Sequence, residues 1–260
     1  RSGIVLTAIE FRRAIVKYEE AEAAPAGPQQ IELYEHAAAM LVDAVDRNPS
    51  NPEAPKALIF AANALTRAGR PTTAQEIYRR VIRDVGDRRG ADEDEQAELD
   101  KIMAESFFRL AAAARSGFEF EVALENYRIL ADSPRFANTQ NAEVREWRGD
   151  ALVNSALLLQ QLGRYREATT YFTRVAQSTT DEDARRNARY AIAEMAYSQR
   201  SYSDAVRDYR AFITTYQRDA AAGELVVQSY WRIAQIRLAL NQQREYQTGL
   251  ADVVRAYAAS

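Results

Sequence analysis

The sequence has 260 residues, 47% of them hydrophobic and 27% charged, which is typical of a chain that folds around a buried core and excludes a disordered or fibrous one. Its formal net charge of −3 excludes the strongly basic surface that nucleic-acid binding requires. It contains no cysteine, which excludes disulfides, and no apolar run near the ~18 residues that cross a bilayer. We therefore expect one soluble domain without a membrane-spanning segment.

The N-terminal part predicts two long helices. Apolar residues recur at helical spacing over residues 4 to 22, and a segment with Pro25, Gly27 and Pro28 interrupts them. A second helix is expected from about residue 30 to 47, and Pro55 suits the first turn of a third. Because the chain begins with Arg1 instead of Met, we expect a fragment whose targeting signal, membrane tether or neighbouring domain has been removed.

An acidic group precedes the helix expected after residue 95. Asp92 to Glu95 lie where side chains cap a helix N-terminus and where negative charge is favourable. A calcium loop is the alternative interpretation, but the alternating ligands and closing Glu of an EF-hand are missing. We interpret the group as a helix start, and a second contact surface there stays open.

A repeated helical hairpin organises the rest of the chain, and its clearest copy spans residues 151 to 176. Two amphipathic helices flank Gly163 and Arg164, and small residues, Ala156 and Ala168, stand where the helices cross. The other clear copies share the second small residue and the aromatic residue after it: Ala74 and Tyr78, Ala123 and Tyr127, Ala205 and Tyr209. Irregular copies flank these four, and the last has Tyr246 at the second small position.

This spacing resembles the tetratricopeptide repeat, a helix-turn-helix unit of 34 residues. The resemblance implies an all-α, right-handed superhelical solenoid of about six hairpins, forming one domain over residues 1–260. The expected irregular repeats are 1–53, 54–90 and 91–140, and the more regular ones are 141–180, 181–218 and 219–260. The form Y-x2-A-x3-Y-x2-F-x3-Y at residues 202–216 resembles repeats of bacterial envelope proteins, the outer-membrane assembly lipoprotein and the Tol-Pal cell-division coordinator among them.

In such a stack the first helices of the hairpins line a concave groove, and residues beside the packing stripe face into it. The partner-binding groove is expected to contain Ile59, Asn63, Phe108, Arg115, Val153, Leu157, Tyr190, Glu194, Tyr197, Trp231 and Gln235. Exposed tyrosine and tryptophan dominate binding energy in protein interfaces. We therefore expect Tyr190, Tyr197 and Trp231 to anchor a partner and Arg115 to orient it. Burial of Tyr190 and Trp231 against the next repeat is the alternative.

No motif for catalysis, cofactor binding or metal binding occurs. The sequence lacks G-x-S-x-G, a phosphate-binding glycine loop and H-E-x-x-H, and His36 is its only histidine. We expect no catalytic residue, cofactor or metal. The predicted function is a non-catalytic scaffold that binds a protein or peptide partner, in the periplasm or at the outer membrane of a bacterium. The alternative is a cytoplasmic regulatory or oligomerisation domain of a larger protein.

Overall fold

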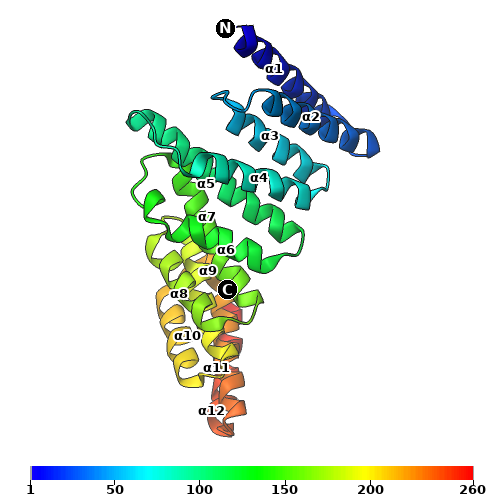
Figure 1. Cartoon of the computed structure of the whole chain (residues 1–260). Helices are drawn as coiled ribbons and strands as arrows, with labels where there is room; N and C mark the ends of the chain where they lie inside the picture. Colours follow the sequence, from blue (N-terminus) through cyan, green and yellow to red (C-terminus); the bar gives the residue numbers. More distant parts are fainter. Residues whose placement is uncertain (1, 260) are drawn as a thin grey trace. The chain divides into compact units, whose positions relative to one another are not determined.

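The computed structural model describes residues 2–259, with the side chains of residues 9–258, and it is all-helical over that range (Figure 1). The helices are α1 (Ser2–Ala23), α2 (Pro28–Arg47), α3 (Ala54–Arg67), α4 (Pro71–Gly86), α5 (Glu93–Ser116), α6 (Phe120–Asp132), α7 (Ala142–Gln161), α8 (Tyr165–Ser178), α9 (Glu182–Ser198), α10 (Tyr202–Tyr216), α11 (Gly223–Ala239) and α12 (Gln243–Ala259). Two short 3₁₀ turns, η1 (Pro134–Phe136) and η2 (Ala220–Ala222), precede α7 and α11. The predicted stack of helical hairpins is confirmed.

The chain forms two compact units, residues 1–151 and 152–260, and α7 contributes to both. In the first unit each helix from α1 to α6 packs on the next, and α3 also contacts α5. In the second unit α8, α9, α10, α11 and α12 pack in the same consecutive way. Each hairpin thus buries its apolar stripe against the following one, so that the core is a seam along each unit.

The repeated small and aromatic residues form this seam. In the second helices the aromatic side chains of Tyr78, Tyr127 and Tyr209 are at most 1% exposed, and Phe172 is 5% exposed. The alanines one turn earlier, Ala74, Ala123, Ala168 and Ala205, are 0% exposed. Small residues let the helix axes approach, and each buried ring then contributes about 1.5–3 kcal/mol of transfer free energy.

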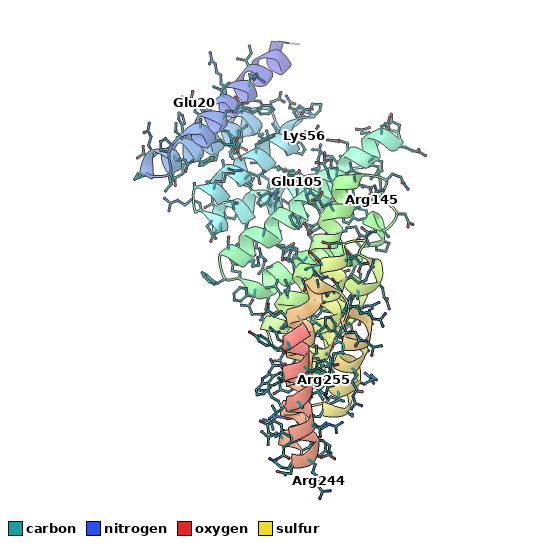
Figure 2. All side chains as sticks on the ribbon, turned by 180° about the vertical axis from the view of Figure 1, so that it is seen from behind. Glu20, Lys56, Glu105, Arg145, Arg244 and Arg255 are labelled. Carbon is teal, nitrogen blue, oxygen red and sulfur yellow. The ribbon has the colours of Figure 1, made fainter. Side chains whose placement is uncertain are left out.

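Aspartate side chains cap the N-termini of two helices, α5 and α9. The Asp92 carboxylate caps α5 by accepting from the Glu95 backbone N–H at 2.8 Å, which confirms the interpretation of the acidic group. Asp181 caps α9 in the same way. Charged side chains cover the outer surfaces (Figure 2), and ion pairs link helices of the first unit, among them Lys56 with Glu98 at 2.9 Å.

Five hairpins turn through one residue in the left-handed region. These residues are Gly69 (φ 74°), Phe118 (φ 63°), Gly163 (φ 72°), Arg200 (φ 58°) and Asn241 (φ 59°). Glycine accepts this backbone without cost, whereas a side chain adds about 1–2 kcal/mol of strain. Phe118 is the bulkiest of the five.

The last hairpin departs from the expected register. Tyr246 stands at the predicted small position, but a Cβ on Gly249 would lie 3.1 Å from the Ala234 Cβ. The close approach of α11 and α12 is therefore made at Gly249, three residues later than the repeat spacing predicts. None of the described side chains of α12 is fully buried, and Val254 and Tyr257 are 69% and 73% exposed.

Candidate functional site

A polar network in the second unit joins α9 to α11 at the Glu194 carboxylate. Glu194 accepts hydrogen bonds from the Tyr190 hydroxyl at 3.0 Å and from Arg232 Nε and Nη2 at 2.8 and 3.0 Å. A third helix contributes through the Tyr209 hydroxyl, which also donates to Glu194. The Glu194 carboxylate therefore links α9 and α11, the first helices of two successive hairpins, with the buried Tyr209 of α10.

These donors set the charge state of the network. Burial by itself raises the pKa of Glu194, but the hydrogen bonds from Arg232, Tyr209 and Tyr190 outweigh it and hold the pKa below its ordinary value. Burial, together with the neighbouring Glu194 carboxylate, raises the pKa of the Tyr190 and Tyr209 hydroxyls. At neutral pH the carboxylate is thus ionised and both hydroxyls keep their protons.

Arg232 also contacts the other groups of this face. Its guanidinium carbon lies 4.7 Å from the centre of the Tyr197 ring, within the range of a cation–π contact. Its Nη1 donates to the Gln235 side-chain oxygen at 3.1 Å. Because Arg232 donates to both Glu194 and Gln235 and lies over the Tyr197 ring, it holds these three side chains in one arrangement.

Apolar side chains lie exposed on the same helix as Arg232. Trp231 is 41% exposed and Leu238 is 46% exposed, and with Gln235 they recur at the i, i+4, i+7 spacing of one helix face. We call the set Tyr190, Glu194, Tyr197, Trp231, Arg232, Gln235 and Leu238 the α9–α11 surface. Exposed tryptophan and leucine beside a rigid polar network can hold an apolar group and a polar group of one ligand.

Each of the four clear hairpins has a position equivalent to Glu194, fifteen residues before its buried aromatic residue. It is occupied by Asn63 before Tyr78, Ala112 before Tyr127, Leu157 before Phe172 and Glu194 before Tyr209. In the first unit the Tyr78 hydroxyl donates to the Asn63 side-chain oxygen at 2.6 Å, so an amide there satisfies the buried tyrosine. Among these four positions only Glu194 adds a charge, and that charge recruits Arg232.

The predicted groove residues of the first unit differ in exposure. Ile59 is 4% exposed and belongs to the core, so the expectation that it faces a groove is wrong there. The next residue, Phe60, is 41% exposed, with its ring 6.0 Å from the Tyr18 ring. Phe108 is half-buried with its edge toward Tyr127 at 5.8 Å, and Arg115 is exposed near the end of α5.

The predicted residues of the second unit divide into two groups. Val153 is half-buried and Leu157 is 48% exposed, both on α7. The network of Glu194 and Arg232 brings together Tyr190, Tyr197 and Gln235, beside Trp231.

Tyr190 plays two parts. Its ring packs on Tyr209 and Phe212, with centroids 5.9 and 5.6 Å away, while its hydroxyl reaches Glu194. Tyr190 is therefore largely a core residue, and Trp231 is the exposed aromatic side chain.

Sequence reasoning missed Phe60, Arg232 and Leu238. The signal for Arg232 was available, because it follows Glu194 by 38 residues, about one repeat, and carries the opposite charge. The signal for Leu238 was its position seven residues after Trp231, the same interval that separates Tyr190 and Tyr197. Phe60 had no comparable signal, since Ile59 and Phe60 are both large and apolar.

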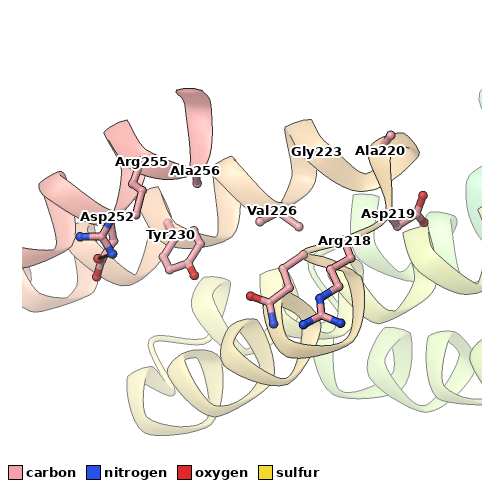
Figure 3. A pocket seen from close by; sticks show the side chains of 10 residues that line it. Arg218, Asp219, Ala220, Gly223, Val226, Tyr230, Asp252, Arg255 and Ala256 are labelled. Atoms are coloured by element: carbon pink, nitrogen blue, oxygen red, sulfur yellow. Dashed lines mark hydrogen bonds and ion pairs between the residues drawn. The ribbon is translucent and has the colours of Figure 1, made fainter. Parts of the chain in front are cut away.

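A hollow of about 510 Å³ lies elsewhere in the second unit, between the α10–α11 connection and α12 (Figure 3). Arg218 and Arg255 line it together with Asp219 and Asp252, and Arg255 pairs with Asp252 at 3.2 Å. Charges of both signs alternate there, so the hollow favours no class of ligand.

The helices of residues 2–259 include none that is both long and apolar enough to cross a membrane.

Comparison with known proteins finds similarity in structure only. No family model matches the chain, and no curated protein matches it. Among solved structures, BtubC (BKLC) from P. vanneervenii is 13% identical with a TM-score of 0.51, over 91% of this chain and 92% of that one. A tetratricopeptide repeat protein from Parabacteroides merdae is 16% identical with a TM-score of 0.53, over 95% and 80%. YrrB, a TPR protein with an unusual peptide-binding site, is 14% identical with a TM-score of 0.50, over 84% and 93%. The chain therefore has the fold of tetratricopeptide repeat proteins.

Proposed function

We propose that the chain is a non-catalytic scaffold that binds a segment of a partner protein on the α9–α11 surface. The observation that carries this proposal is the exposure of Trp231 and Leu238, 41% and 46%, beside side chains that Arg232 and Glu194 hold in place. The peptide-binding site of YrrB, a protein of the same fold, supports the proposal by analogy.

The surface offers two kinds of contact to such a segment. Trp231 and Leu238 present apolar area for an aliphatic or aromatic side chain of the partner. Gln235 lies between them and has an amide for a backbone group of the partner. Because Glu194 and Arg232 satisfy each other, they do not need the partner, and binding requires little rearrangement of the surface.

Photo-crosslinking from position 231 tests the proposal. A photoreactive amino acid in place of Trp231 identifies the partner in cells, and the affinity of the purified partner is then measured for the native chain and for Trp231→Ala. A hot-spot tryptophan is worth about 2 kcal/mol or more, so we expect at least ~30-fold weaker binding.

Tyr257→Ala, which removes a side chain 73% exposed on α12, is the matched control and should bind normally. Equal affinity of the native chain and the Trp231→Ala variant, with both folded, would refute the assignment of this surface.

We also propose a bacterial envelope location, on the form of the repeat at residues 202–216 and its resemblance to envelope proteins. A lipobox or signal sequence ahead of Arg1 in the gene, and recovery of the protein with the envelope fraction, would support it. Recovery with the cytoplasm as part of a larger polypeptide would instead support the alternative of a regulatory or oligomerisation domain.

A further inference from the structure

A second hollow lies in the first unit, between the parallel second helices α4 and α6. It has a volume of about 340 Å³, and Ile82, Phe107, Leu110 and Val122 form its apolar lining. Helix α5 lies between α4 and α6 and supplies Phe107 and Leu110. We call this hollow, with Arg79, Arg83 and Glu125 at its edges, the α4–α6 groove.

Phe118, in the turn before α6, is exposed in an unfavourable conformation. It is 80% exposed although it carries the left-handed backbone that glycine provides in two of the other turns. Its ring contacts Phe120 at 6.1 Å. The left-handed backbone belongs to the hairpin turn, as it does at Arg200 and Asn241, but the turn does not require an aromatic ring exposed to water at this position. An exposed aromatic ring next to an apolar hollow is typical of a contact surface.

Side-chain hydrogen bonds connect this turn to the groove. Glu119, next to Phe118, accepts from Gln75 Nε2 at 2.6 Å, and the Gln75 oxygen accepts from Arg79 Nη2 at 2.8 Å. Gln75 is 1% exposed, so this link is fixed within the fold. At the other end of α6, Ile129 is 38% exposed. From Phe120 to Ile129 α6 is about 14 Å long, roughly two and a half helical turns.

The α4 edge of the groove is positively charged. Arg79 and Arg83 are exposed one turn apart, and neither forms an ion pair with a carboxylate in the part of the chain that the structure describes. Arg80, between them, pairs with Asp46 and Asp84 instead. Acidic side chains of a ligand would therefore meet two available guanidinium groups on this edge.

We propose that the α4–α6 groove and Phe118 dock an amphipathic segment of a partner protein that carries acidic side chains along the flank facing α4. The apolar face of that segment covers the hollow and the Phe118 ring, and its acidic side chains pair with Arg79 and Arg83. Glu121 and Glu125 lie on α6, across the hollow from the arginines of α4, so the acidic side chains of the segment face α4 only. A uniformly anionic membrane surface would meet both edges and be opposed by the α6 carboxylates, which favours a protein ligand. This surface is separate from the α9–α11 surface.

The test uses a dye-labelled peptide of about 14 residues with Leu on one helical face, Glu along one flank and Gln elsewhere, and a second peptide with Lys at every Glu position. Fluorescence anisotropy with residues 1–260 should show at least tenfold tighter binding of the Glu peptide. The double variant Arg79→Glu and Arg83→Glu should reverse this preference, and Phe118→Ser should weaken binding at least tenfold.

Two controls separate docking from folding and from the other surface. Phe118→Gly removes the ring while relieving the backbone, so binding should fall although the melting temperature does not. Tyr257→Ser and Trp231→Ala should leave peptide binding unchanged. Equal binding of both peptides, or binding that ignores the arginine and Phe118 substitutions, would overturn the proposal. So would sedimentation showing a dimer that Phe118→Ser dissociates, because the groove would then hold a second copy of the chain.

Discussion

Glu194 is the residue whose removal tests the structure most directly. We predict that Glu194→Leu, Arg232→Met and the double variant form a strongly non-additive set. In Glu194→Leu the Tyr209 hydroxyl loses its acceptor in an environment where the side chain is 0% exposed. An unsatisfied buried hydroxyl costs about 1–3 kcal/mol.

The contribution of Arg232 is smaller because its side chain is 32% exposed and water can replace the lost partner, at a cost below about 1 kcal/mol. The single change at Glu194 should thus lower the free energy of unfolding by roughly 1–4 kcal/mol. Arg232→Met leaves Glu194 with two hydroxyl donors and should cost about 1–2 kcal/mol.

Because Glu194 and Arg232 interact directly, the double variant should be more stable than the sum of the single effects predicts, by about 1 kcal/mol or more. Urea unfolding followed by circular dichroism measures the four free energies. Arg207→Met, at an exposed ion pair with Asp204, is the control and should leave the unfolding midpoint unchanged. Effects that add to within about 0.5 kcal/mol would show that Glu194 and Arg232 do not interact, and the description of the site would be wrong.

Three further predictions follow from the same structure. The folded-state pKa of Glu194 lies below its unfolded value of about 4.3, so its ionised form stabilises the folded chain above that pH. This contribution is lost as the pH falls through the folded-state pKa. Urea unfolding from pH 7 down to 3 should therefore show a steeper loss of stability for the native chain than for Glu194→Gln. Ala168→Leu should overpack the fully buried helix crossing and cost about 1–3 kcal/mol, seen as a lower melting temperature, and an unchanged one would contradict the packing described. Gly163→Ala should cost about 1 kcal/mol in thermal melts because φ is 72° there, whereas Gly149→Ala, in α7 with no atom within 4 Å of the added Cβ, should not destabilise the chain.

The sequence by itself determined the hairpins and most of the core. The small and the aromatic residue of each hairpin, such as Ala168 and Phe172, recur at a fixed spacing. That spacing depends only on helix geometry and on contacts between neighbouring hairpins, so it is visible without coordinates. The helix caps at Asp92 and Asp181 are equally local, since each uses backbone groups two or three residues away.

Only the tertiary structure decided which residues at the edge of each packing stripe are exposed. Adjacent side chains of a helix point about 100° apart around its axis, so the tilt of the neighbouring helix decides whether Ile59 or Phe60 is buried. The same holds for Gly249, which replaces position 246 at the last crossing. The Glu194–Arg232 pair and the exposed ring of Phe118 depend on side chains of separate helices and on a turn conformation. The repeat spacing places Arg232 one repeat after Glu194, but the contact between the two side chains and the exposure of the Phe118 ring are decided only in the folded chain.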